Sequence, residues 1–514
     1  MEQSFTDLLI RIRKGSRVTY PVEAWLGDGS FYEGELRLTS ALRRDLLIKD
    51  FEPLAYGEML FEHLFDGDIA TAYDVATGLA RQRSERRLRL RLLLDEGAPA
   101  ELHAIKWERL ADLQGHPLGI DGNTPLSRYT ALRRPEPGPL DEAVVRLLFV
   151  VSSPNNLANL DLAPLDVEAE LDRLLDALGE VWRNERCQAT ILPGRSGLRP
   201  ALRARLEAAG CTIAGGHATL DNVGRHLRDG RHHALHFLGH GQYAGGHGYL
   251  LLEDEAGALN RVVDTALAAE LGNTPLRLVF LAACESARRD AGPAAGQAPA
   301  RAFQGLAGRL VQDGGIAAVV AMQAPIDVDA AYRLAGEFYR RLFLDHGVVD
   351  RALNEARSML YAGREKDWGT PVLTMRLKTG QLARPNPAWS ALRAIGQHSD
   401  YSMFRSERYV DLPIQATLVD EDQDVGRQEE GVPQTIGTLD LLDAILSHLA
   451  SGDGGADPGD AAAPLVLVLG GPSTGKSTQM KRLGWQTVRA GLKAPAGQFF
   501  LPLYLDLQEY RPGG

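Results

Sequence analysis

A histidine and a cysteine each follow an apolar run in a way that suits nucleophilic catalysis. His240 comes directly after the run 234–239, and Cys284 comes directly after the run 276–283. A thiol is a strong nucleophile only as the thiolate, and an imidazole, whose ordinary pKa lies near neutrality, can generate it. Gly241 has no Cβ and can turn its amide toward an oxyanion, where the Cys284 amide can join it. These residues predict a thiol nucleophile, its base and an oxyanion site.

Buried strands and amphipathic helices alternate around these two residues, which predicts a mostly parallel sheet flanked by helices. The expected strands are Val145 to Val151, Ala189 to Leu192, Ala234 to Leu238, Leu276 to Ala282 and Ile316 to Met322. The expected helices are Asp166 to Leu178, Leu220 to Asp229, Ala302 to Asp313, Asp329 to Asp345 and Val349 to Tyr361. His240 and Cys284 would then emerge at the carboxyl ends of neighbouring strands, where open α/β sheets place their chemistry.

The first part of the chain reads as a mixed α/β unit. Its expected strands are Pro21 to Leu26, Phe31 to Leu38 and Leu88 to Leu94, and its expected helical stretch is Tyr56 to Phe65. We interpret the arginine-rich run Arg81 to Arg91 as a solvated helix face. The segment Arg133 to Leu140 carries three prolines and marks either a domain boundary or a crossing loop.

Several motifs resemble the CHAT family, a caspase-like group related to caspases and separases. They are HFLGHG (236–241), LAACES (281–286), GLAGRLVQDGGIAAVVAMQAPI (305–326) and WERL (107–110), together with the pieces FYRRL, AL..AR and WGTPVL that end at Leu373. Together these motifs span most of residues 80 to 376. The resemblance implies a six-stranded caspase-type sheet and a peptide-cleaving dyad, with His240 as base and Cys284 as nucleophile. The caspase pattern around the cysteine is replaced by AACES. The resemblance therefore does not imply cleavage after aspartate.

Other residues near the expected site have structural explanations that compete with functional ones. A metal site could be suggested by the four histidines His232, His233, His236 and His247. They lack the i, i+4 spacing of ligands on a helix and acidic ligands at fixed offsets, so we expect structural roles and no metal. Cys187 and Cys211 are expected to be structural. Asp327 and Asp329 either border the substrate cleft or cap a helix. The Ala, Gly and Pro-rich loop Ala287 to Ala300 is either a gate over the site or a tolerated insertion.

A phosphate-binding loop is predicted near the end of the sequence. GGPSTGKS (470–477) fits the pattern GxxxxGK[ST] and follows the apolar run Leu465 to Leu469. The residues expected to bind ATP and Mg²⁺ are Gly470, Gly475, Lys476, Ser477 and Thr478. Backbone amides of the loop would curl around the phosphates, the lysine would reach the terminal phosphates, and the serine would ligate the metal.

The pieces RYVDLPIQ (408–415) and FFLPLYLDLQEY (499–510) resemble the opening of a NACHT-type STAND ATPase. No Walker B strand follows within the sequence, so we expect a fragment of a longer protein that does not hydrolyse ATP by itself. The expected domain order is an N-terminal α/β region of the CHAT unit (1–135), a caspase-like protease domain (136–380), a linker (381–435) and an incomplete NACHT domain (436–514).

Composition limits the class of protein. The 514 residues are 44% hydrophobic and 24% charged, which is ordinary for a globular protein of several domains. The net charge of -11 argues against general nucleic-acid binding. Three cysteines give no disulfide framework and favour a reducing cytoplasm, and no stretch approaches the roughly 18 apolar residues of a membrane span.

The sequence therefore predicts a cysteine endopeptidase that acts on protein substrates and needs no cofactor for its chemistry. The resemblance implies that an attached ATP-binding NACHT module controls it through self-oligomerisation, in bacterial antiviral defence or cell-death signalling. Two alternatives stay open: a non-catalytic caspase-like scaffold on a STAND NTPase, and a P-loop ATPase with an uninvolved α/β domain.

Overall fold

The structure is a computed structural model of the whole chain. It describes residues 5–385, apart from 83–86, 96, 143, 161, 163, 183–185, 283–296 and 325, together with 414–416, 434–436 and 484. The chain divides into two compact units, Met1–Asn386 and Pro387–Gly514. In the second unit, β16 (Ile414–Ala416) and β17 (Gln434–Ile436) pair antiparallel. The expected phosphate-binding loop lies outside the described residues.

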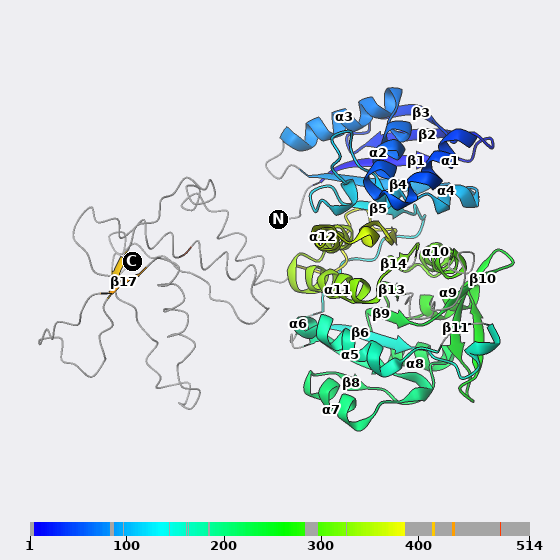
Figure 1. The fold of residues 1–514 in the computed structure, drawn as a ribbon, viewed down its shortest axis with the longest axis vertical. Coiled ribbons are helices and arrows are strands. Elements are labelled where there is room, and N and C mark those ends of the chain that lie inside the picture. Colours follow the sequence, from blue (N-terminus) through cyan, green and yellow to red (C-terminus); the bar gives the residue numbers. More distant parts are fainter. Residues whose placement is uncertain are drawn as a thin grey trace, which may run out of the picture. The chain divides into compact units, whose positions relative to one another are not determined.

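One twelve-stranded sheet runs through the first unit (Figure 1). In sheet order its strands are β3 (Phe31–Arg37), β2 (Thr19–Leu26), β1 (Thr6–Ile12), β4 (Leu88–Leu94), β5 (Leu126–Tyr129), β15 (Pro371–Met375), β14 (Ala318–Met322), β13 (Leu278–Ala282), β9 (Ala234–Leu238), β6 (Val145–Val151), β7 (Cys187–Leu192) and β8 (Thr212–Ile213). Only the pairs β3 with β2, β2 with β1, and β15 with β14 are antiparallel. The predicted fold class, a mostly parallel sheet flanked by helices, is confirmed.

The sheet is larger than the six strands that the resemblance implies. Strand β5 pairs with β15 in parallel, with Thr374 opposite Arg128 and Met375 opposite Tyr129. Because of this pairing, the strands of the first 135 residues continue the same sheet. A separate three-stranded sheet consists of β10 (Gly241–Ala244), β11 (His247–Glu253) and β12 (Leu259–Val263).

Helices cover both faces of the part of the sheet from β15 to β8. In chain order the α-helices of the first unit are α1 (Ser40–Ile48), α2 (Pro53–Leu64), α3 (Gly67–Gln82), α4 (Ala100–Ala104), α5 (Val167–Ala177), α6 (Gly179–Trp182), α7 (Pro200–Ala208), α8 (Leu220–Asp229), α9 (Asp264–Gly272), α10 (Gln297–Gln312), α11 (Val328–Tyr339) and α12 (Val349–Ala362). The first four of them, α1 to α4, share a core with the N-terminal strands instead. On β9, Leu235 and Phe237 share a core with Leu267 of α9, whereas His236 packs beside Tyr339 of α11. The alternation of side chains along a strand therefore fills two cores.

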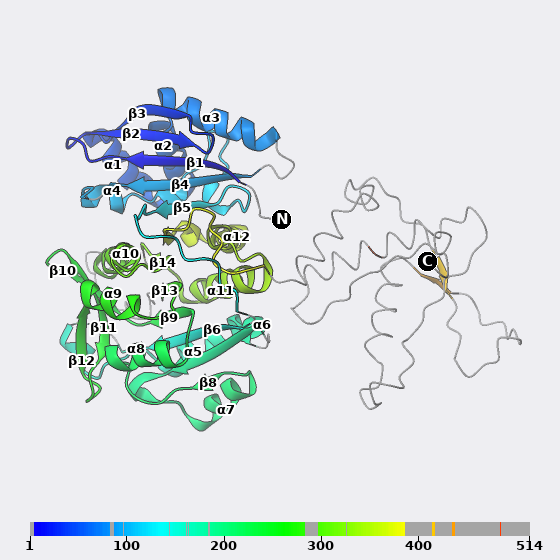
Figure 2. The same ribbon diagram turned by 180° about the vertical axis from the view of Figure 1, so that it is seen from behind.

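The N-terminal strands have one face covered by helices α2 and α3, and Figure 2 shows their other face. The interpretation of Arg81 to Arg91 as a solvated helix face holds for Arg81, which is exposed on α3, and is wrong for Arg87 to Arg91. Helix α3 ends at Gln82, and Arg89 lies on β4 with its side chain only 3% exposed. An ion pair with Asp350 of α12 compensates its charge there.

Most predicted elements are confirmed, with shifted ends. Strands β4, β6 and β9 and helix α8 have the predicted bounds. Helix α10 begins at Gln297, five residues before the expected start, so the end of the expected loop Ala287 to Ala300 is helical. The helix expected over 329–345 is α-helical only to Tyr339 and continues as a π-helical turn, Arg340–Asp345. Strands β1, β5, β8 and β15 of the main sheet and the three strands β10, β11 and β12 have no predicted counterpart.

The proline-rich segment Arg133 to Leu140 is a crossing connection. Strand β5 ends at the sheet edge where β13 and β14 begin, and β6 begins at the same edge. The chain must therefore run along this edge, past β15, β14, β13 and β9, before it starts β6. Along the way, the main-chain carbonyls of Arg134 and Pro135 accept hydrogen bonds from Arg376. Among the described residues, no helix has the length and apolar character that crossing a membrane requires.

Candidate active site

The carboxyl ends of the central strands form a common edge of the sheet. Val151, Leu238 and Ala282 are the last residues of β6, β9 and β13, and the strand register places them side by side. Strand β14 is parallel to β13, with Ala321 opposite Leu281, so it ends at the same edge. Groups that follow these strands are therefore brought to one place, as the sequence predicts.

His240 lies two residues beyond the end of β9 and is 6% exposed. Its main-chain carbonyl accepts a hydrogen bond from the Leu251 amide (3.0 Å), and the next residue, Gly241, begins β10. The amide of Ser152 donates to Leu238 O (2.9 Å), and the Ser152 hydroxyl donates to Leu251 O (2.8 Å). His240 is thus held between the main sheet and the three-stranded sheet.

The connection from β9 to His240 depends on a glycine. A Cβ on Gly239 would lie 2.4 Å from Cζ of Phe237, whose ring is packed in the core beneath it. Any side chain at this position would push the ring or the main chain aside, and His240 is the next residue. Gly241 is buried and pairs with Leu250 in β11. The use of its amide as an oxyanion donor stays a prediction.

Cys284 lies outside the described residues. The residue two positions before it, Ala282, is paired in register with Leu238, which is two positions before His240. The two expected catalytic residues thus follow a register pair at the same distance along the sequence. Most of the expected gate, Ala287 to Ala300, also lies outside the described residues.

A buried carboxylate that the sequence analysis missed joins the loops at this edge. Glu253 ends β11 and is 0% exposed. Its carboxylate accepts hydrogen bonds from the amides of Arg195 (2.9 Å), Ala218 (2.8 Å) and Ser153 (3.4 Å). These amides lie in the loops after β7, β8 and β6, so one side chain ties three loops to the strand that pairs with β10. In the sequence Glu253 is only the polar residue that ends an apolar run, and this pattern does not indicate a buried carboxylate.

A second buried network supports the end of β14. Arg128 on β5 forms an ion pair with Glu108 of the WERL motif (Nε to Oε1, 2.8 Å) and donates to Oε1 of Gln323 (3.0 Å). The Gln323 amide group donates in turn to Glu108 Oε2 (3.0 Å). Every pair in this triangle is bonded, which is the condition under which a buried polar network stabilises. The network fixes the first residue after β14 and thereby the loop that follows.

Asp327 and Asp329 lie at the start of α11, in that loop. The carboxylate of Asp327 accepts a hydrogen bond from the Ala330 amide (3.0 Å) and caps the helix. Asp329 has a side chain 77% exposed, at 3.6 Å from Nε of Arg173. The capping role is thus observed for Asp327, and contact of either residue with a substrate stays a prediction.

The four clustered histidines have structural partners. His236 stacks between Phe149 and Phe280, with ring centroids at 5.2 and 4.7 Å, and its Nδ1 lies 3.1 Å from the hydroxyl of Tyr339. Burial lowers the pKa of His236 to about 3, so the ring is neutral.

The other three histidines each have a different partner. His232 contacts Thr190 Oγ1 (3.0 Å), His233 accepts from the Arg146 amide (3.1 Å), and His247 lies 3.0 Å from the buried Asp264. The described part of the chain contains no group of His, Cys, Asp and Glu side chains arranged to hold a metal ion.

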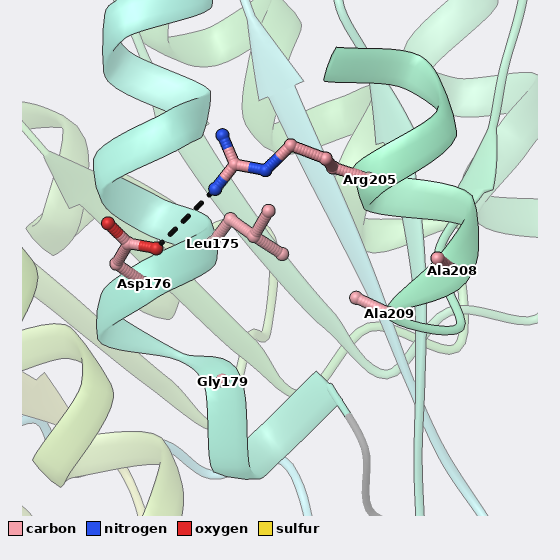
Figure 3. A pocket seen from close by; sticks show the side chains of 6 residues that line it. All are labelled: Leu175, Asp176, Gly179, Arg205, Ala208 and Ala209. Atoms are coloured by element: carbon pink, nitrogen blue, oxygen red, sulfur yellow. Dashed lines mark ion pairs between the residues drawn. The ribbon is translucent and has the colours of Figure 1, made fainter. Parts of the chain in front are cut away.

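The described cysteines are poor nucleophiles. Cys187 and Cys211 are buried, and burial raises the pKa of each thiol to about 12. A pocket of about 410 Å³ also lies away from His240. It is formed where α5 ends and α7 faces it, with Arg205 pointing to Asp176 at 3.7 Å (Figure 3). Since α5 runs from the carboxyl end of β6 back toward the amino end of β7, this pocket lies at the opposite edge of the sheet.

The CHAT domain family matches residues 54–397, about two thirds of the sequence. The chain belongs to the CHAT family. The family match includes His240, Gly241 and Cys284 and defines a caspase-like, protease-type domain. It ends before the pieces that resemble a NACHT ATPase. No curated protein matches the chain.

Among solved structures, the CHAT chain is similar to two crystal structures of the Saccharomyces cerevisiae separase-securin complex. The TM-scores are 0.30 and 0.29, at 12% identity in both, over 67% and 66% of this chain. It covers only 21% and 20% of those chains.

Proposed function

We propose that this CHAT protein is a cysteine endopeptidase in which His240 is the general base and Cys284 the nucleophile. His240 would take the thiol proton, and the thiolate would attack a peptide carbonyl to form an acyl-enzyme that water then hydrolyses. The amides of Gly241 and Cys284 would stabilise the oxyanion. Asp327 and Asp329 are the acidic residues proposed to border the cleft.

The observation that carries the proposal is the register pair of Leu238 and Ala282. It brings the strands that lead to His240 and Cys284 side by side, with the same number of residues left to each. The burial of His240 and the loops tied by Glu253 give further support, because a general base works only when it is held in position. A non-catalytic scaffold would need neither feature.

Alkylation of the three cysteines tests the proposal without knowledge of the substrate. Iodoacetamide labelling of the full chain is followed by mass spectrometry from acid to neutral pH. We expect Cys284 to react faster than Cys187 and Cys211 by at least an order of magnitude at pH ~6, because only its thiol would be activated. The buried Cys187 and Cys211, whose thiol pKa values are about 12, serve as internal references.

The variant His240→Ala should abolish the fast labelling of Cys284. The variant His247→Ala is the matched control, because His247 contacts Asp264 and pairs with Ala244, three residues beyond Gly241 on β10. Slow labelling of Cys284 in the wild type would favour the scaffold. If Cys284→Ala kept every activity and Lys476→Ala removed it, the chain would be a P-loop ATPase.

We further propose that an ATP-binding module, with Gly470, Gly475, Lys476, Ser477 and Thr478 around ATP and Mg²⁺, controls the peptidase by self-oligomerisation. The segment that leads out of the first unit supports such control. The Leu382 amide donates to Gly347 O (2.9 Å), and the Gln381 side chain donates to His346 O (2.9 Å), directly after the π-helical turn. ATP-dependent change in size, measured by light scattering and lost in Lys476→Ala, tests this. A role in antiviral defence belongs to the same proposal.

A further inference from the structure

A smaller pocket, of about 210 Å³, lies at the sheet edge opposite to His240. Three arginines from different parts of the sequence line it: Arg134 in the crossing connection, Arg277 just before β13, and Arg376 just after β15. They meet because β15 is antiparallel to β14, so its carboxyl end lies where β13 and β14 begin. The pocket is thus separate from the proposed peptidase site.

These arginines have no ion-pair partner among the described residues. Arg376 is 4% exposed, and its two Nη groups donate to the carbonyls of Gly315 (3.2 Å), Arg134 (2.7 Å) and Pro135 (2.5 Å). Within the described chain, Nε of Arg376 and Nε of Arg277 are buried and have no hydrogen-bond partner. A buried donor without a partner is costly, so these two atoms add positive polarity beside the pocket that no acceptor in the described chain offsets.

The positive charges also act on one another. Burial lowers the pKa of Arg376, and the charges of Arg134 and Arg277 lower it further. Glu136 acts in the opposite direction, but its carboxylate accepts a hydrogen bond from the Lys378 amide (3.1 Å). A mobile anion in the pocket would relieve the repulsion among the three guanidinium groups.

The walls of the pocket leave room for such an anion close to the main chain. Gly272, Gly314 and Gly315 contribute no side chains. Gly315 has a φ of +68°, and a Cβ there would lie 2.3 Å from Nη1 of Arg134, so a larger residue would displace that arginine. The volume is below the about 300–1,000 Å³ typical of pockets for drug-sized ligands, which suits a single small group.

We propose that this pocket binds a small phosphate-bearing anion, either free phosphate or the phosphate group of a small metabolite. The planar guanidinium groups match phosphate oxygens in bidentate geometry, which makes arginine the usual residue for this task. The bound anion joins the crossing connection to β13 and β15, so it stabilises the folded state by an amount that grows with the logarithm of its concentration above the Kd.

Isothermal titration calorimetry with inorganic phosphate tests the proposal on the full chain carrying Lys476→Ala, which removes the expected contribution of the phosphate-binding loop. We expect saturable binding with a Kd below about 1 mM. Arg277→Gln should weaken it by about tenfold or more, because one charge-assisted contact is lost. Arg277 is the residue of choice because its side chain makes no ion pair within the described chain, so the variant should fold.

The control is Arg333→Gln, since Arg333 on α11 is paired with Glu365 and should not affect phosphate binding. A parallel titration with a sugar phosphate distinguishes the two sources: tighter binding than phosphate points to a metabolite, and weaker binding points to free phosphate. Absence of saturable binding of both probes would overturn the proposal, and so would equal affinities in Arg277→Gln and its parent.

Discussion

Arg89 on β4 and Asp350 on α12 form a buried ion pair, with 2.7 Å between Nε and Oδ2. Their side chains are 3% and 0% exposed, and they are 261 residues apart in the sequence. The pair joins the N-terminal strands to the helix that follows the π-helical turn. The two parts of the first unit are therefore coupled by charge as well as by the pairing of β5 with β15.

Removal of one partner should be strongly destabilising. In Asp350→Ala, the Arg89 charge stays buried without compensation, so we expect the free energy of unfolding to fall by about 3–5 kcal/mol. Urea unfolding followed by circular dichroism measures the change. The exposed pair of Arg37 and Glu35, with side chains 73% and 51% exposed, is the control, and Glu35→Ala should cost less than about 1 kcal/mol. A similar small loss in Asp350→Ala would contradict the coupling.

Glu253 should matter to the site as well as to stability. Glu253→Ala leaves three amides without their acceptor, and each unsatisfied buried donor costs roughly 1–3 kcal/mol. We expect slower alkylation of Cys284 because the loops beside His240 lose their common anchor. Glu255→Ala, two residues away and exposed, is the matched control. Normal labelling in a folded Glu253→Ala protein would show that the loops do not position the site.

Gly239 offers a direct test of the link between β9 and His240. Gly239→Ala should slow the labelling of Cys284, because the added Cβ would lie 2.4 Å from Cζ of Phe237. The double variant Gly239→Ala with Phe237→Leu should recover part of the rate, since the smaller side chain gives the methyl group room. Failure of the second change to help would mean that the clash is not the cause.

His236 should make the fold sensitive to acid. Burial lowers its pKa from 6.5 to about 3, so between these values the unfolded chain binds a proton that the folded chain does not. Its contribution is complete above pH 6.5 and is lost as the pH falls, by roughly 2 kcal/mol between pH 6.5 and pH 5. His236→Phe should lose correspondingly less stability over this range in urea unfolding.

The control for His236 is Tyr339→Phe, which removes the hydroxyl that lies 3.1 Å from Nδ1 but keeps the imidazole. This variant should retain the wild-type dependence on pH. If His236→Phe and the wild type lost stability in parallel between pH 6.5 and pH 5, the buried ring would not be the source.

The strands near the site could be predicted because all but one residue in each is apolar. Val145 to Val151 and Ala234 to Leu238 are buried on both faces, and that local property is visible in the sequence. The burial of Arg89 was not predictable, because its partner Asp350 is distant in sequence and an arginine run otherwise indicates solvent. The burial of Glu253 was not predictable for the same reason, since its three amide partners come from three different loops. Local patterns report burial well, whereas compensation of buried charge depends on the complete topology.

The two ends of the twelve-stranded sheet are poor templates for strand addition. At one end, β8 has only two residues, so an incoming strand would find almost nothing to pair with. At the other end, β3 carries Glu33, Glu35 and Arg37 along an edge that is mostly exposed. Short and charged edge strands are the means by which sheet proteins avoid edge-to-edge aggregation. A sheet this long can thus stay free of aggregation at high local concentration, such as a clustered assembly of these chains would create.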